Sequence, residues 1–184
     1  MELNALMNTL LSSESIESIS RTAGVSEKET RRVLAGALPQ MLSGAEGQAT
    51  DEATAEGFAK ALNDHAQDDV SDVRGFLGGV DLIDGGKILA HLLGGGQNAL
   101  MESTAASSGL KPAQVVKILS IAAPLLMSLL GQQAQQDNSS AGVGTLMTAL
   151  LGKTDTAKLI QTLLFGKKKK KGVLGLLGLL LGKK

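Results

Sequence analysis

The chain has 184 residues, a formal net charge of zero and an apolar content of 43%, enough to build the core of one or two small domains. It contains no cysteine, which excludes disulfides, zinc fingers, iron–sulfur clusters and thiol nucleophiles. Aromatic residues make up only 2% of the chain, which argues against strand-rich sandwiches and barrels and against aromatic platforms for single-stranded nucleic acid. A core of Leu, Ala, Ile, Val and Met predicts close-packed helices.

The balanced net charge hides an uneven distribution. Residues 167–184 contain seven lysines and no acidic residue, so residues 1–166 carry 11 basic and 18 acidic side chains, a net charge of −7. Ten of those acids lie between Glu46 and Asp84. The chain is therefore an acidic body with a basic tail, and such asymmetry bears on association rather than on fold. The N-terminus has neither a basic start nor a long apolar stretch, which does not fit a secretory signal, so we expect a cytoplasmic protein.

Residues 1–50 predict a first helical unit of two short helices and a longer one over 28–42. Gly24 breaks the chain before the longer helix. Ser26 and Glu29 then form a capping-box pattern, in which the hydroxyl and the carboxylate satisfy exposed amides at a helix start. The longer helix carries its apolar residues on one broad face and is expected to turn that face to the core.

Residues 51–83 predict an acidic helical connection that begins with an amphipathic helix over 51–63. Its acids suggest a cation site at first sight, because hard cations favour several carboxylates. The spacing matches no calcium-binding loop, however, and a solvated acidic surface accounts for it, so we expect no metal ion. The residues considered for such a site are His65, Asp68, Asp69, Asp72, Asp81 and Asp84.

Residues 84–131 predict a second helical unit built around a core helix over 112–130. Its stretch from Val115 to Leu130 is apolar at almost every position, and a helix that is apolar nearly all round must be enclosed. At 16 residues the stretch is shorter than the roughly 20 residues that a membrane span requires. We therefore expect the centre of a soluble helical assembly, and its core positions are Val115, Ile118, Leu119, Ala122, Pro124, Leu126 and Leu129.

The two units are related by a shift of 85 residues. Seven of the 28 positions from 16 to 43 are then identical, among them Gly24 with Gly109 and Pro39 with Pro124. A random match would give roughly two identities, so the shift indicates a duplicated helical unit. Proline inside a helix removes one backbone hydrogen bond and clashes with the carbonyl four residues back, so both copies are expected to be kinked at the same turn.

Residues 132–166 predict a polar linker and two short helices, the second over 155–165 with Thr154 as its cap. The tail over 167–184 follows. A helix over 172–182 would be only about 16 Å long, roughly half a bilayer core, so the tail cannot span a membrane. It can lie in a membrane interface, or dock on the acidic body of its own or a neighbouring copy. The tail residues expected to interact are Lys167, Lys168, Lys169, Lys170, Lys171, Leu174, Leu176, Leu177, Leu180, Lys183 and Lys184.

A family resemblance rests on two segments, GVSEKETRRVLAGALPQML at 24–42 and DGGKILAHLLG at 84–94, the latter followed by residues 109–130. Together they resemble the YidB-like proteins, a bacterial family whose domain has no known function. The resemblance covers residues 6–45 and 80–131 and so indicates a tandem or extended version of that domain. It implies an all-helical bacterial protein, and it carries no catalytic residues. The acidic middle and the lysine-rich tail are not part of it.

The turn at Gly24 also fits a helix-turn-helix motif, which would place Arg31 and Arg32 against DNA bases or phosphates. Glu27 and Glu29 would enter the same negatively charged groove, and the acidic body opposes the phosphate attraction that drives such binding. Two helices joined by a glycine turn are also a common packing unit. Nucleic acid is therefore the weakest of the partner hypotheses.

No residue pattern points to an enzyme. His65 and His91 are the only histidines, and neither belongs to a Ser/His/Asp or metal-ligand pattern. His91 is expected to be a helix residue with its ring at an edge. The glycines at 94–96 lack the strand–loop–helix context and the following Lys-Ser/Thr of a phosphate loop. We expect no catalysis, no cofactor and no small-molecule substrate.

The sequence thus predicts an all-α multi-helix bundle of two related units with Pro-kinked core helices, followed by a C-terminal helical extension. For function, we expect a non-enzymatic structural or scaffold protein that forms a homo-oligomer or filament. Leu/Ala/Gly helix packing and contacts between the basic tail and the acidic body would hold the copies together. The alternative is a peripheral membrane protein that the tail anchors to an anionic surface, and DNA binding comes third.

Overall fold

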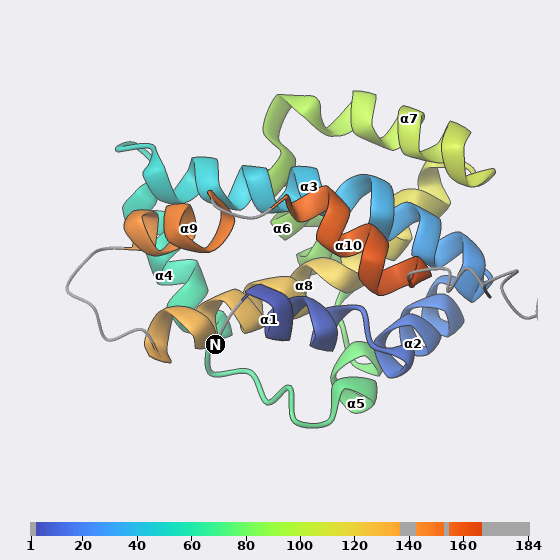
Figure 1. The fold of residues 1–184 in the computed structure, drawn as a ribbon, viewed down its shortest axis with the longest axis horizontal. Coiled ribbons are helices and arrows are strands. Elements are labelled where there is room, and N and C mark those ends of the chain that lie inside the picture. The colour runs from blue at the N-terminus through green and yellow to red at the C-terminus, as the bar shows by residue number, and fades with distance from the viewer. Residues whose placement is uncertain (1–2, 137–142, 153–154, 167–184) are drawn as a thin grey trace, which may run out of the picture.

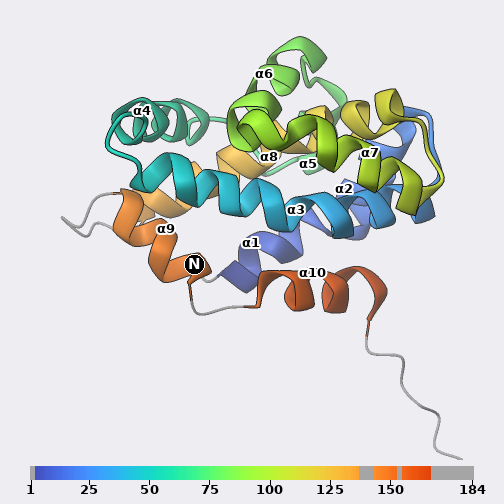
Figure 2. The same ribbon diagram turned by 90° about the horizontal axis from the view of Figure 1, so that it is seen from above.

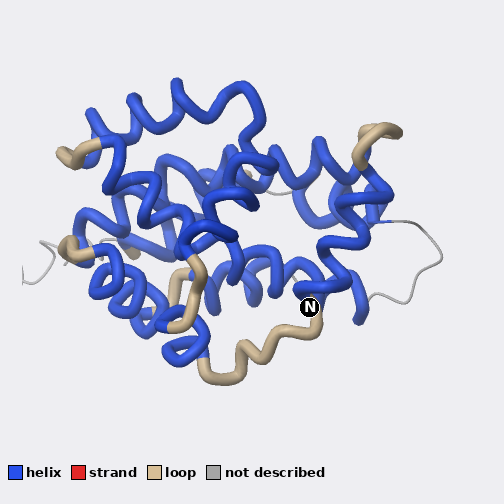
Figure 3. Tube along the Cα trace, turned by 180° about the vertical axis from the view of Figure 1, so that it is seen from behind, coloured by secondary structure: helices blue, strands red, loops and turns tan. Residues whose placement is uncertain are grey.

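The computed structural model describes residues 3–136, 143–152 and 155–166, and within those ranges every regular element is a helix (Figure 1, Figure 3). The predicted all-α bundle is confirmed. The elements are α1 (Leu3–Leu10), α2 (Ser13–Ala23), α3 (Glu27–Thr50), α4 (Ala55–His65), α5 (Val73–Gly78), α6 (Leu82–Leu93), the 3₁₀ turn η1 (Gly94–Gly96), α7 (Gln97–Ser108), α8 (Pro112–Gln136), α9 (Val143–Leu151) and α10 (Thr156–Phe165).

Short polar side chains begin several of these helices. The predicted capping box is present at α3, where the Ser26 hydroxyl accepts a hydrogen bond from the Glu29 amide and the Glu29 carboxylate accepts one from the Ser26 amide at 2.8 Å. At α6 the Asp81 carboxylate accepts from the amide of Ile83 at 2.7 Å. That cap starts α6 at Leu82.

Two helix starts differ from the sequence prediction. Asp155, not Thr154, is the cap of α10, and its carboxylate accepts from the Lys158 amide at 3.0 Å. The short helix α5 was not predicted, because its six residues carry too little periodicity to distinguish it from a loop. Asp72 begins it by accepting from the Gly75 amide at 3.0 Å.

The duplicated unit recurs in the helix boundaries. The boundaries of the helix pair α2–α3 match those of the pair α7–α8 when the chain is shifted by the 85 residues found in the sequence. Between the helices of each pair a glycine adopts the left-handed conformation that other residues avoid, with φ of 74° at Gly24 and 80° at Gly109. Pro39 and Pro124 occupy equivalent places inside α3 and α8. The repeat is therefore present in the structure as well as in the sequence.

Each copy of the repeat covers the long helix of the other. α2 packs against α8 while α7 packs against α3, and the next helices continue the exchange, with α4 on α8 and α9 on α3. Buried residues from both copies form one continuous core. Figure 2 shows α3 in the middle of the bundle, with α10 on one side and α4 and α6 on the other.

α8 lies at the centre of this core, and all residues from 121 to 130 are buried. The core positions predicted for this helix are buried without exception, and they are Val115, Ile118, Leu119, Ala122, Pro124, Leu126 and Leu129. The enclosure comes from the same chain, chiefly from α4, α6 and α2. A second copy is therefore not needed to cover α8.

α8 is also longer than the predicted helix over 112–130, because it continues through glutamines that were expected to begin a linker. Gln132 Nε2 donates to the Asp68 carbonyl at 3.0 Å, and Gln135 Nε2 donates to Asn63 Oδ1 at 3.1 Å. These bonds hold the polar turn against the end of α4. Within the described residues, α8 is the one helix long and apolar enough to cross a membrane, but 78% of its most apolar window is buried in the bundle, as in a core helix.

Glycines allow several helices to approach closely. A Cβ built on Gly85 of α6 would overlap the carbonyl oxygen of Ser120 in α8. Pro124 has no N–H to offer that carbonyl, so the α6 backbone lies over the acceptor that the proline leaves free. Similar overlaps would follow a Cβ on Gly44 in α3 or on Gly131 in α8. The glycine content of the chain thus serves helix contacts as well as turns.

Candidate functional site

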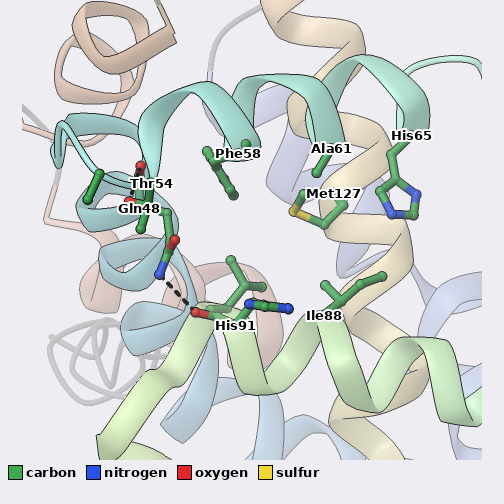
Figure 4. A pocket seen from close by; sticks show the side chains of 11 residues that line it. Gln48, Thr54, Phe58, Ala61, His65, Ile88, His91 and Met127 are labelled. Carbon is green, nitrogen blue, oxygen red and sulfur yellow. Dashed lines mark hydrogen bonds between the residues drawn. The ribbon is translucent and has the colours of Figure 1, made fainter.

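The bundle contains an apolar pocket of about 360 Å³ between α4 and α6. Phe58 and Ala61 of α4 and Ile88 and Leu92 of α6 line its walls, and Met127 of α8 lies behind them (Figure 4). The volume falls in the range of about 300–1,000 Å³ that is typical of small-molecule sites. The sequence did not predict this pocket, so it is a new candidate for function.

Both histidines of the chain border the pocket. His65 lies in the last turn of α4 and His91 in the last turn of α6. Gln48 reaches in from α3, and its Nε2 donates to the His91 carbonyl at 3.1 Å (Figure 4). His91 was expected at the edge of its helix, and that edge borders the cavity. The spacing of residues in the sequence does not show the cavity.

Asp68 connects the edge of the pocket to the core. Its Oδ2 lies 3.0 Å from His65 Nδ1 and accepts a hydrogen bond from the buried Ser128 hydroxyl at 2.6 Å. The serine hydroxyl faces the carboxylate and not the imidazole, so the histidine is not placed to activate it as a nucleophile. The arrangement ties α8 to the chain that follows α4.

Acidic residues lie in the chain next to the pocket-lining residues at both ends of the pocket. Figure 4 shows α4 and α6 running in opposite directions along it, so the start of α6 lies near the end of α4. At one end, Asp51 and Glu52 are exposed just before the stretch of α4 that lines the pocket. At the other end, Asp68 contacts a pocket histidine, and the exposed Asp84 lies one helical turn before Ile88 on the same face of α6.

The acids considered as metal ligands are engaged in separate turns. Asp72 and Asp81 cap α5 and α6, as described above. Asp69 accepts from the Ser71 amide at 2.9 Å, and hydrogen bonds from the Ser71 side chain and backbone hold the pKa of Asp69 below its ordinary value. Among the residues that the structure describes, no three His, Asp or Glu side chains gather as metal ligands would.

The segment that resembles a DNA-binding motif forms the exposed end of α3. Arg31 pairs with Glu27 one turn earlier at 3.3 Å. Hydrogen bonds from the Ser26 side chain and then its backbone lower the pKa of Glu29, which keeps that carboxylate charged. Two carboxylates at the helix start oppose a phosphate backbone, so the geometry gives no support to the DNA hypothesis.

The predicted tail contacts, from Lys167 to Lys184, lie outside the described residues. In the described part of the chain, the exposed large apolar side chains are Leu82, Ile83 and Phe165. Helices that expose so little apolar surface offer few places for helix packing between copies.

A family model described as a bacterial protein of unknown function (DUF937) matches residues 5–133, from α1 to the last turn of α8. The chain belongs to this family. YidB is a member of it, so the resemblance seen at 24–42 and 84–94 is confirmed. The DUF937 match also runs through the acidic connection at 51–83, which the resemblance had left out, and it spans both copies of the repeat. No curated protein and no solved structure matches the chain.

Proposed function

We propose that this DUF937 protein is a non-enzymatic structural or scaffold protein that assembles with further copies of itself through its C-terminal tail. The observation that carries the proposal is the separation of charge, seven lysines in residues 167–184 against a net charge of −7 in residues 1–166. Opposite charges on two parts of one chain favour the encounter of separate copies at low ionic strength.

The acidic surface is available for such a contact. Eight of the ten acids between Glu46 and Asp84 are exposed. The basic residues in that stretch are Lys60 and Arg74, and Arg74 is already paired with Glu17 at 3.1 Å. The uncompensated negative charge thus lies on the surface of α4, α6 and the segments beside them.

Apolar sequence in the tail supports the same proposal. Seven of the nine residues from Val173 to Leu181 are large and apolar, and such side chains favour removal from water. Because α8 is enclosed by its own chain, apolar association through the described helices has less support than association through the tail.

The proposal predicts that the full-length chain is larger than a monomer and that a chain ending at Gly166 is not. Light scattering over a concentration series, with negative-stain microscopy, compares the two proteins, and circular dichroism checks that both remain helical. We expect the full-length mass to rise with concentration and the shortened chain to stay monomeric. Two monomers at high concentration would contradict the proposal.

The same tail supports one alternative, attachment to an anionic membrane surface. Five consecutive lysines, Lys167 to Lys171, precede the apolar segment, and each contributes about 1 kcal/mol near such a surface. Cosedimentation with vesicles of anionic phospholipid distinguishes the two functions. A full-length chain that stays monomeric in solution but sediments with the vesicles at low salt only would replace the scaffold proposal with the membrane one.

A further inference from the structure

The pocket between α4 and α6 and the C-terminal tail have matching patterns. The tail is apolar from Val173 to Leu181 with lysines on both sides, whereas the pocket is apolar in the middle with acids at both ends. We propose that tail residues 172–182 of one copy bind in the α4–α6 pocket of the next copy. The inference rests on the proposed function, because it names the surface that receives the tail.

The size of the pocket fits the apolar middle of the tail. A cavity of about 150 Å³ accepts one benzene molecule. At about 360 Å³, the pocket therefore has room for about two leucine side chains from the segment. Walls of Phe58, Ile88, Leu92 and Met127 favour such side chains and disfavour a lysine ammonium. Leucines therefore enter the pocket while the lysines remain at its ends.

The charges at the two ends select a segment that is basic at both ends. Five lysines precede residue 172 and two follow residue 182. Asp51 and Glu52 lie at one end of the pocket and Asp68 and Asp84 at the other, so lysines meet acids in either direction of binding. Each such surface pair contributes little by itself, but several of them together steer the encounter, fix the orientation and add to the affinity that the apolar side chains supply.

The geometry of the bundle assigns the tail to a neighbour. α10, from which the tail leaves, packs on one side of α3, and α6 packs on another, so the pocket is on the far side of the bundle (Figure 2). Residues 166–172 span at most about 25 Å when fully extended. Two helix–helix spacings of about 8–10 Å separate α10 from α6 through the core. Figure 2 also shows that α10 ends at the opposite end of the bundle from α4, so the tail would have to pass around the bundle and along it to reach its own pocket. The tail can reach the pocket of a second copy without passing around its own bundle.

A tail in the neighbour's pocket is a heterologous contact. Each copy then offers one tail and one pocket, so the assembly closes into a ring or grows as a filament. The tail fills a cavity that the fold already contains, so assembly leaves the fold of each copy unchanged.

Filling the pocket tests the inference. Gly57 lines the pocket and a Cβ there meets no atom within 4 Å, so Gly57→Leu places a side chain in the cavity without a backbone clash. Gly47 in α3 has equally open surroundings and does not line the pocket, so Gly47→Leu is the matched control. In the full-length chain, we expect G57L to raise the concentration at which assembly begins by at least about tenfold and G47L to leave it unchanged.

Disulfide cross-linking gives a second readout that does not depend on affinity. The chain has no cysteine, so one preparation can carry Ala61→Cys in the pocket wall and another Leu177→Cys in the tail. After mixing and mild oxidation, we expect a disulfide-linked dimer of the two proteins. The pair Gly47→Cys with Leu177→Cys should stay at background, because a disulfide requires Cβ atoms about 3.5–4.5 Å apart.

The failure of this inference differs from the failure of the proposed function. If the unaltered chain is a monomer, the proposed function fails and the inference fails with it. If the chain assembles, but G57L assembles as readily and the 61–177 pair cross-links no better than the 47–177 pair, the tail binds elsewhere. That result would overturn the inference and leave the proposed function standing.

Discussion

Gly85 and Gly86 are neighbours near the start of α6 but have different surroundings. A Cβ on Gly85 would overlap the Ser120 carbonyl, whereas one on Gly86 would make an ordinary contact, 3.7 Å from Ser120 Oγ. We expect Gly85→Ala to lower the free energy of unfolding by about 1–3 kcal/mol, because α6 must move away from α8. Gly86→Ala should be neutral or stabilise by up to about 1 kcal/mol, because alanine favours a helix. Urea unfolding measures both, and equal effects would contradict the close packing of α6 on α8.

Residues with partners nearby in the sequence could be predicted, and residues with distant partners could not. The Ser26–Glu29 capping box was predicted because both members lie within one helical turn. His65 and His91 were recognised as the only histidines, but nothing in their spacing showed that they border one pocket. That neighbourhood depends on α4 and α6 meeting over α8, which is a tertiary contact.

At the scale of one helix, the capping box makes the stability of α3 depend on pH. Hydrogen bonds from Ser26 lower the pKa of Glu29 in the folded state below its usual value of 4.5. The contribution of this carboxylate is therefore present above that usual pKa and is lost as the pH falls through the folded-state pKa. We expect Ser26→Ala to lower the Tm by about 2–4 °C at pH 7 and by less at pH 3. Thermal unfolding at both values measures this, and an equal loss at both would contradict the role of the charged carboxylate.

α8 shows which properties of a helix its sequence leaves open. Apolar residues all round predicted that the helix is enclosed, and the structure confirms it. The same pattern has no preferred face, so it could not predict that α2 of the first copy and α4, which follows that copy, cover the second copy's long helix. The C-terminal turn was assigned to a linker because its glutamines are polar, and their partners, Asp68 and Asn63, are 64 and 72 positions away.

At the scale of the whole molecule, the chain combines a core enclosed by its own helices with an acidic body and a basic tail. The core was predictable in composition and helix content, and the 85-residue shift predicted two related units. The sequence could not predict that each unit covers the long helix of the other, because this arrangement depends on long-range contacts that leave no periodic pattern. The separation of the basic tail from the acidic body is visible in the sequence alone, and the proposed association rests on it.

Assembly through the tail is the central claim, and sedimentation velocity of the full-length chain tests it most directly. The comparison protein carries Gln in place of the five residues Lys167–Lys171, and both are measured over a concentration series at low and high salt. We predict that the unaltered chain sediments as assemblies that become smaller when salt screens the charges, whereas the glutamine variant is largely monomeric at the same helix content. A single monomeric boundary for the unaltered chain at every concentration and salt level would contradict the account.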